Sequence, residues 1–313
     1  MAGELSSMTS LIVLKFFPGS PDYIGMEASS RRSLSHRSRL LQSLNKLPPF
    51  SPVVNQLIAG LANEHVHFAE LAQWVEKDTV IAGHVLRTVN SALYALPGTI
   101  SSIPHAIAIL GRDKLRNAVL ALSLARMWRH EPGAKTWSTR AFSLHSAATG
   151  ALADLLAQLL PVDYAEGAFA AGLFHDVGKL LAAIALPVDY DLLCESFTGQ
   201  QQESKACEEA IFGISHSELS ALAVAYWKLP AAVQQAVRQH HTPEGATSDC
   251  WPLSKLVSVA DLCVNSMQIC IAPTVAISTD SPEQCLSRSG VPGNPGRLVE
   301  ELLTELELLQ KSF

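Results

Sequence analysis

The chain has 313 residues, of which 48% are hydrophobic and 6% aromatic, so it can bury a large core and is not disordered over most of its length. Acidic residues (29) outnumber basic ones (23), and the net charge of −6 argues against an overall nucleic-acid-binding surface. The six cysteines show no C-x-x-C spacing, which predicts free thiols in a reducing cytoplasm. No apolar run reaches the roughly 18 residues that span a bilayer, so we expect no membrane association.

We expect residues 1–38 to form a disordered leader, because they are rich in Ser, Gly and Arg and show little hydrophobic periodicity. Arg31, Arg32, Arg37 and Arg39 crowd around His36 at the end of this segment. They could form a basic arm that contacts phosphate, but a solvated, flexible leader is the favoured interpretation.

Residues 39–133 are predicted to form an N-terminal helical lobe. Hydrophobic residues recur there with the helical period, and helices are expected at residues 51–63, 68–77, 80–92, 103–110 and 113–129. The last two, separated by Gly111, could form a helix-turn-helix, but the second is apolar nearly all round and is therefore expected in the core. The run His130-Glu131-Pro132-Gly133 marks an internal boundary.

Residues 134–272 are predicted to form a second helical lobe, with helices at residues 136–160, 164–186, 190–196, 201–212, 217–228, 231–240 and 253–270. No segment alternates convincingly with the period of a strand, so the expected fold class is all-α. Residues 273–295 have the Ser, Pro and Gly content of a linker. Residues 296–313 are expected to form a C-terminal amphipathic helix, whose stripe of leucines docks on the body or on a partner.

The segment Gly172-Leu173-Phe174-His175-Asp176-Val177-Gly178-Lys179 places polar residues inside a very apolar predicted helix. Burying His175, Asp176 and Lys179 together requires mutual pairing, a metal ion or a wet cavity. Lys179 follows His175 by four residues, so both would lie on one helix face, with Asp176 turned about 100° away. A metal would then lie between the histidine and the aspartate, and this pair of ligands suits Mn, Fe, Zn or Ni.

Further polar residues in the second lobe extend this pattern: His145, His216, His240, His241 and Asp261. Asp261 lies inside an otherwise apolar predicted helix, and a buried helical aspartate without an obvious partner is itself a site candidate. The six histidines before residue 131 show no ligand spacing beyond chance.

The chain resembles an HDOD domain, a relative of the HD phosphohydrolases and of the HD-GYP phosphodiesterases, over about residues 40–272. The front half of the resemblance is carried by Leu47-Pro48-Pro49, Glu76-Lys77-Asp78, Asn90-Ser91-Ala92-Leu93-Tyr94 and Ala106-Ile107-Ala108-Ile109-Leu110-Gly111. The back half is carried by His145-Ser146, residues 168–179, His216, Trp227-Lys228-Leu229-Pro230 and His240-His241. One departure is Thr79, where the family favours Pro.

The resemblance implies an all-helical fold in two lobes, with a C-terminal lobe shaped like an HD hydrolase. It implies a role in bacterial signal transduction, with protein partners such as response regulators or proteins of cyclic-di-nucleotide pathways. It also implies one or two divalent transition metal ions, of Fe, Mn, Zn or Ni. The positions that match a mononuclear site are His145, His175, Asp176 and Asp261. Those that match a second metal are His216, His240 and His241, with Asp176 as the bridge and Lys179 as a phosphate contact.

Two departures from the related hydrolases bear on activity. The relatives that hydrolyse cyclic-di-GMP carry a Gly-Tyr-Pro segment after the histidine pair, and residues 242–248 contain none. The three-metal relatives place an acidic ligand four residues before the first histidine, where this chain has Ala141. Cyclic-di-GMP hydrolysis and a trinuclear centre are therefore poorly supported.

Three functional hypotheses follow, and we favour the first, a regulatory module that acts through protein partners, with or without a bound metal. The alternative is a metal-dependent phosphohydrolase or phosphodiesterase that takes a nucleotide or cyclic nucleotide. The third hypothesis is a nucleic-acid-binding regulator that uses the arginines of residues 31–39, which the overall charge disfavours. In the first hypothesis the histidines could also form a polar core network with ordered water in place of metal.

Overall fold

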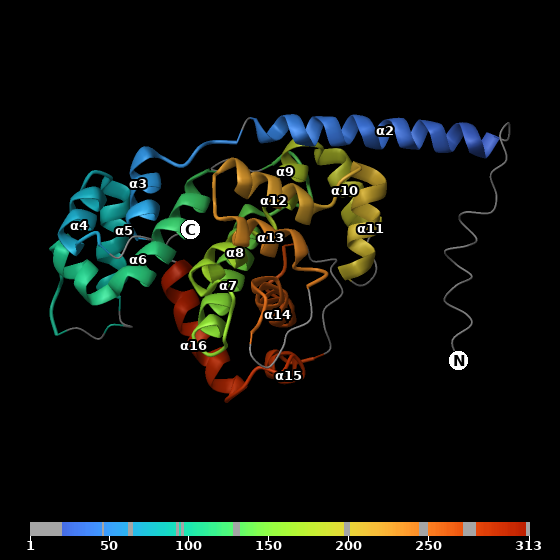
Figure 1. The fold of residues 1–313 in the computed structure, drawn as a ribbon. Coiled ribbons are helices and arrows are strands. Elements are labelled where there is room, and N and C mark those ends of the chain that lie inside the picture. Colours follow the sequence, from blue (N-terminus) through green and yellow to red (C-terminus); the bar gives the residue numbers. More distant parts are fainter. Residues whose placement is uncertain are drawn as a thin grey trace.

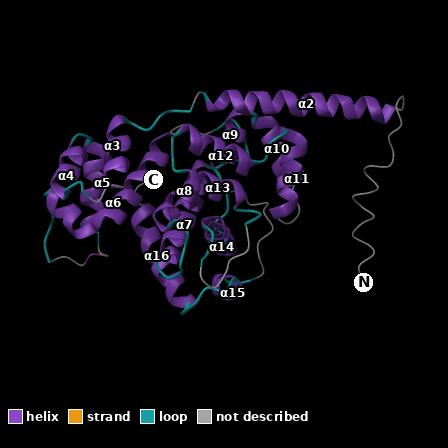
Figure 2. Cartoon of the chain, viewed as in Figure 1, coloured by secondary structure: helices purple, strands orange, loops and turns teal. Residues whose placement is uncertain are grey.

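The computed structural model shows a chain built from α-helices, with no β-strand in the part of the chain that it describes (Figures 1 and 2). The described residues are 21–45, 47–61, 65–91, 94, 97–127, 132–196, 201–243, 250–271 and 280–310. The predicted all-α fold class is confirmed. The expected internal boundary at residues 130–133 lies mostly outside the described residues.

Four helices gather at one end of the molecule, and we call them the front helices (Figure 1). They are α3 (Pro52–Leu61), α4 (Phe68–Glu76), α5 (Thr79–Val89) and α6 (Ile103–Met127). Asp78 begins α5 by accepting hydrogen bonds from the backbone N–H groups of Val80 and Ile81 at 3.0 and 3.1 Å. Gly111 kinks α6 with a φ of 77°, a left-handed conformation that favours glycine. The helix after this kink is largely buried, which rules it out as a helix laid in a DNA groove.

The remaining core helices form the body of the protein. They are α7 (Thr139–Ala157), α8 (Ala168–Phe174), α9 (Val177–Ala185), α10 (Pro187–Ser196), α11 (Gln201–Phe212), α12 (His216–Tyr226), α13 (Ala231–Gln239) and α14 (Leu253–Ser266). Helices α7 and α8 pack closely because glycines meet at their crossing. A Cβ atom on Gly172 would lie 2.7 Å from the Gly150 Cα and 2.7 Å from the Thr149 carbonyl oxygen.

The expectation of one continuous helix over residues 164–186 is wrong. A short 3-10 turn, η2 (Ala165–Gly167), precedes α8, and the chain then leaves helical geometry at Asp176, with φ −107° and ψ 10°. Residues 165–185 together are long and apolar enough to cross a membrane by length and composition, which the sequence reading missed. However, 83% of an 18-residue window within this stretch is buried inside the protein, so we assign it to the core.

The expectation of a disordered leader through residue 38 is wrong for residues 21–38, which lie in the long helix α2 (Pro21–Leu44). This helix crosses α9, α11 and α12, and its Leu40 is fully buried. Arg32 donates to Asp189 at 2.6 Å, Arg37 to the Gly213 carbonyl at 3.2 Å and Arg39 to the Ala185 carbonyl at 2.8 Å.

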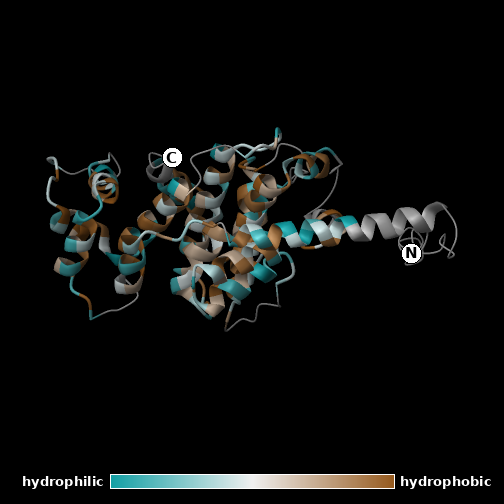
Figure 3. Ribbon diagram, turned by 90° about the horizontal axis from the view of Figure 1, so that it is seen from above, coloured by the Kyte–Doolittle hydropathy of each residue, from teal (hydrophilic) through white to brown (hydrophobic). Residues whose placement is uncertain are grey.

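These bonds explain why a polar sequence is ordered. Hydrophilic residues are prominent on α2 where it crosses the body (Figure 3). The described arginines of the predicted basic arm therefore fasten the helix to the protein. Residues 1–20, the rest of the predicted leader, lie outside the described residues.

The C-terminal segment carries two helices. One of them, α15 (Pro282–Arg288), occupies part of the segment expected to be a linker, and Ser281 and Gln284 form its capping box. The other, α16 (Pro295–Gln310), packs on α7 with Leu298, Leu302 and Leu306 buried. The leucine stripe therefore faces the body. Residues 272–279 and 311–313 lie outside the described residues.

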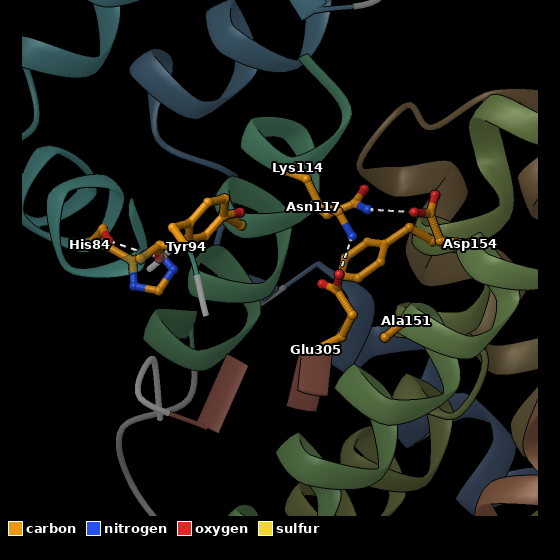
Figure 4. Close-up of a pocket in the computed structure, with 10 residues that line it drawn as sticks. His84, Tyr94, Lys114, Asn117, Ala151, Asp154 and Glu305 are labelled. Carbon is orange, nitrogen blue, oxygen red and sulfur yellow. Dashed lines mark hydrogen bonds and ion pairs between the residues drawn. The ribbon is translucent and has the colours of Figure 1, made fainter. Parts of the chain in front are cut away.

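A pocket with several polar side chains in its lining lies where the front helices, the body and α16 meet (Figure 4). Its lining includes His84, Tyr94, Lys114, Asn117, Asp154 and Glu305. The Asn117 amide donates to Asp154 at 3.1 Å, and Lys114 forms an ion pair with Glu305. This polar junction ties α16 to α6, while burial raises the pKa of Asp154.

Replacing Gly172 with Ala is expected to destabilise the protein by about 1–3 kcal/mol, because the added methyl would overpack against the backbone of α7. Gly83→Ala in α5 is the matched control, since no described atom lies within 4 Å of a Cβ there. The control should be neutral or stabilising by up to about 1 kcal/mol. Urea unfolding followed by circular dichroism measures both, and equal stability of the two variants would contradict the close crossing.

His84 is expected to make stability depend on pH. Burial and the nearby Arg87 charge lower the pKa of His84 to about 4, whereas an unfolded histidine titrates near 6.5. Between these values the unfolded chain binds more protons, so stability falls as the pH falls, by at most about 1.4 kcal/mol per pH unit from this group. His84→Gln should lose less stability than wild type between pH 7 and pH 5, whereas the exposed His105→Gln should match wild type. Parallel curves for His84→Gln and wild type would contradict this assignment.

Candidate metal centre

The structure brings all seven of the predicted ligand residues into one place in the body. His145 comes from α7, His175 and Asp176 from the break between α8 and α9, and Asp261 from α14. His216 begins α12, and His240 and His241 follow the end of α13. Six of the seven are buried and His241 is half-buried. Five separate segments of the chain therefore supply one cluster.

Three of the histidines are oriented by backbone carbonyl groups. The Nδ1 atoms of His145, His175 and His240 each lie 2.7 Å from a carbonyl oxygen, those of Ile269, Gly172 and Val237 respectively. Because a carbonyl can only accept, Nδ1 carries the proton in each ring. The Nε2 atom of each ring then faces the cluster, which is the orientation that a metal-binding histidine requires.

The carboxylate of Asp176 lies between two groups of histidines. Its Oδ2 atom lies 3.3 Å from the Nε2 of His175 and 3.6 Å from that of His145. Its Oδ1 atom lies 3.2 Å from the Nε2 of His216 and 3.9 Å from that of His240. Each oxygen therefore faces a different group.

We define the first group as His145, His175, Asp176 and Asp261, and the second group as Asp176, His216, His240 and His241. Asp261 belongs to the first group because its Oδ1 atom lies 3.2 Å from the Nε2 of His145 and 3.5 Å from that of His175. In the second group, and in the first without Asp261, the ligand atoms lie within 4.8 Å of one another. Ligands about 2.0–2.2 Å from one ion have this kind of mutual spacing.

The charges of the cluster favour cations. Three buried carboxylates, those of Asp176, Asp261 and Glu208, are accompanied by one ammonium group, that of Lys179. Burial alone would oppose a charge on His175, yet Asp176 and Asp261 raise the pKa of this imidazole to about 10. The carboxylates therefore attract positive charge into a site from which water is largely excluded.

Two buried acceptor atoms of the cluster also suit the role of metal ligand. Among the described residues, neither Asp176 Oδ1 nor His240 Nε2 has a hydrogen-bond partner. Burial also holds the pKa of His240 well below its ordinary value, so its ring is neutral and Nε2 keeps its lone pair. Unpaired acceptors of this kind, surrounded by imidazoles and carboxylates, suit a divalent transition metal.

The sequence predicts that Lys179 and His175 lie on one helix face. This is wrong, because the chain leaves helical geometry at Asp176. The Nζ atom of Lys179 instead donates to Asp176 Oδ2 at 2.7 Å, three residues earlier, and 24% of its side chain is exposed. Burial opposes the charge, but Asp176, Asp261 and Glu208 raise the pKa of Lys179, so it remains an ammonium ion. It lies against the carboxylate shared by both groups.

Glycine and serine bring α9 and α12 together beside the cluster. The backbone N–H of Gly178 donates to Ser220 Oγ at 2.7 Å. A Cβ on Gly178 would collide with the carbonyl oxygen of His216, so no larger residue fits this approach. This crossing places His216 beside Asp176.

Sequence reasoning missed Glu208 of α11. Its carboxylate lies 2.7 Å from Nδ1 of His216, so it does for His216 what carbonyl groups do for the other rings. The predicted helix at residues 201–212, which contains Glu208, has mixed polar character, so one more carboxylate in it does not stand out. The only sequence signal is that Glu208 precedes His216 by eight residues.

Comparison with known proteins shows which proteins share this fold. The family model for the HDOD domain matches residues 47–243, more than half of the chain. A Geobacter sulfurreducens HDOD domain protein of unknown function is 21% identical, with a TM-score of 0.68, and the match covers 91% of this chain and 99% of that one.

Two further solved structures share this fold. A Marinobacter aquaeolei VT8 protein described as a "Putative signal transduction protein" is 19% identical with a TM-score of 0.66, and the match covers 89% of this chain and 66% of that one. A Shewanella amazonensis SB2B protein described as a "Putative phosphohydrolase" is 21% identical with a TM-score of 0.64, covering 88% and 97%. The TM-scores of these matches show a common fold, and at identities this low the matches show nothing beyond the fold.

A curated relative of Treponema pallidum (strain Nichols), described as an uncharacterized protein, is 20% identical over 272 residues. The match covers 86% of this chain and 50% of the relative. The chain thus spans about half the length of this relative.

Proposed function

The chain belongs to the HDOD family, and we propose that it is a cytoplasmic regulatory module of bacterial signal transduction that acts through protein partners and carries a divalent metal centre. The observation that carries the metal part of this proposal is the placement of Asp176 between two groups of inward-facing histidines. A fold shared with a protein described as acting in signal transduction supports the regulatory part.

The first group would hold one ion and the second group a further ion, with Asp176 contributing an oxygen to each. A divalent transition metal bound there would supply the positive charge that the buried carboxylates lack, and it would act as a Lewis acid towards a phosphate ligand. The residues themselves preorganise the site, because carbonyl groups and Glu208 hold the rings with Nε2 inward before any ion arrives.

The division of the protein favours a regulatory role. All seven ligand residues come from the body, and the front helices supply none of them. The family match nevertheless includes the front helices, because it begins at residue 47. Because the metal centre is complete without the front helices, these helices are suited to binding a protein partner. Response regulators and proteins of cyclic-di-nucleotide pathways are the partners that we propose.

A metal-dependent phosphohydrolase that acts on a nucleotide or cyclic nucleotide is the second candidate. The observation that favours it is the partly exposed ammonium group of Lys179 beside the shared carboxylate, where it could meet a phosphate group. Both groups also contain all the ligand residues that the resemblance to the HD phosphohydrolases implies. By contrast, Arg32, Arg37 and Arg39, the described arginines of the predicted basic arm, are engaged with the body, which weakens the nucleic-acid hypothesis.

Metal analysis tests the proposed centre. Wild-type protein incubated with Mn²⁺ or Fe²⁺ and then passed through a desalting column should retain metal, and His175→Ala should retain much less because it loses a ligand. His105→Ala removes an exposed histidine of α6 and should behave as wild type. Elemental analysis by mass spectrometry measures the metal content. Wild-type protein that retains none under any of these conditions would contradict the metal centre.

Turnover separates the two candidate functions. The regulatory proposal expects the metal-loaded protein to hydrolyse a panel of nucleotides and cyclic nucleotides no faster than His175→Ala does. If instead wild type releases product and His175→Ala does not, the phosphohydrolase is the correct interpretation. In that case Lys179→Gln should weaken turnover, and Lys77→Gln, an exposed lysine after α4, should leave it unchanged.

A further inference from the structure

Glu208 makes the most concentrated set of polar contacts to any one histidine of the cluster. Its side chain is 3% exposed and lies on α11, on the side of His216 away from Asp176. One oxygen accepts the backbone N–H of His216 at 2.7 Å, and both oxygens lie 2.7 Å from its ring Nδ1. One carboxylate thus holds both the backbone and the ring of a single candidate ligand.

This contact distinguishes the second group from the first. His145 and His175 of the first group donate from Nδ1 to neutral carbonyl oxygens, whereas His216 donates to a charged carboxylate. Hydrogen bonds to ionised groups are about twice as strong as neutral ones. A carboxylate partner also makes the opposite ring nitrogen more basic and therefore a better metal ligand.

Side chains from α2, α10 and α11 enclose this contact. Leu40 of α2, Tyr190 of α10 and Phe212 line the same small cavity as Glu208 and His216. The turn that joins α11 to α12 contains Gly213, with a φ of 70°, and the Ser33 carbonyl of α2 would lie 2.8 Å from a Cβ there. Helix α2 therefore packs directly on the turn that links Glu208 to His216.

We infer that Glu208 is a positioning residue that sets the metal affinity of the second group, and so determines whether the centre holds one ion or two. This inference rests on the proposed metal centre. The first group takes its ring partners from Ile269 and Gly172, which are independent of Glu208, so its affinity should not depend on this carboxylate.

The experiment compares Glu208→Gln with Glu209→Gln in the full chain. The Glu208→Gln substitution keeps the size of the side chain and one acceptor oxygen but removes the charge, while Glu209 is the exposed neighbour on the same helix. Each protein is titrated with Mn²⁺, the bound metal is counted by elemental analysis, and electron paramagnetic resonance distinguishes a coupled Mn²⁺ pair from an isolated ion.

Wild type and Glu209→Gln should bind about two ions and show the coupled spectrum. Glu208→Gln should bind the second ion roughly 10- to 100-fold more weakly, the range expected when an outer partner of a metal ligand is removed. At limiting Mn²⁺ it should show the isolated-ion spectrum with the first affinity unchanged. If circular dichroism shows that Glu208→Gln does not fold, Glu208→Asp, which shortens the side chain and so draws the carboxylate away from His216, takes its place; it should weaken the second ion and leave the first affinity unchanged.

The outcomes separate this inference from the proposed function. If wild type binds two ions and the Glu208 variant binds two with the same affinities, the role of Glu208 is wrong and the metal centre stands. If a folded Glu208 variant loses both ions equally, the selectivity for the second group is wrong. If wild type binds no Mn²⁺, the metal centre and the role of Glu208 both fail.

Discussion

The buried carboxylate of Asp176 is the constraint around which the body is arranged. It has almost no access to water, and an isolated carboxylate in such a place would be strongly destabilising. Burial alone would raise the pKa of Asp176, but His175, Lys179 and His216 hold it well below its ordinary value. The helices α7, α9, α12 and α13 are thus tied to one charge, because each contributes or adjoins a group that faces it. Metal ions would supply positive charge at the same place.

Two helices end at the cluster because adjacent residues serve there as candidate ligands. Consecutive side chains of an α-helix point about 100° apart, so neighbouring residues cannot both face one centre while the helix continues. His175 and Asp176 escape this restriction because the chain leaves helical geometry between α8 and α9. His240 and His241 escape it at the end of α13. His145 and Asp261 need no break, since each is a single residue in the middle of a helix.

The same contrast shows which features a sequence can reveal. Helical periodicity is local, so the all-α class followed directly from it, and resemblance located the residues that the fold brings together. The break at Asp176 could not be read from the sequence, because the apolar pattern resumes directly after it and continues to residue 186. Nor could the order of α2, because its arginines bind Asp189 and Gly213, which lie 157 and 176 residues further along the chain. Glu208 was missed for the same reason, since its role exists only once α11 folds over His216.

The first and last of the described helices contact different sides of the centre, and this bears on regulation. Helix α2 packs on α11 and α12, and His36 lies 3.0 Å from the carbonyl of Ile211, just before the turn that leads to His216. Helix α16 packs on α7, the helix that carries His145, and its Glu305 pairs with Lys114 of the front helices. A partner that displaced α2 would therefore disturb the second group first, whereas one that moved the front helices would act through α16 and α7 on the first group. In a regulatory module, this arrangement would let two inputs reach one centre by separate routes, since Asp176 belongs to both groups.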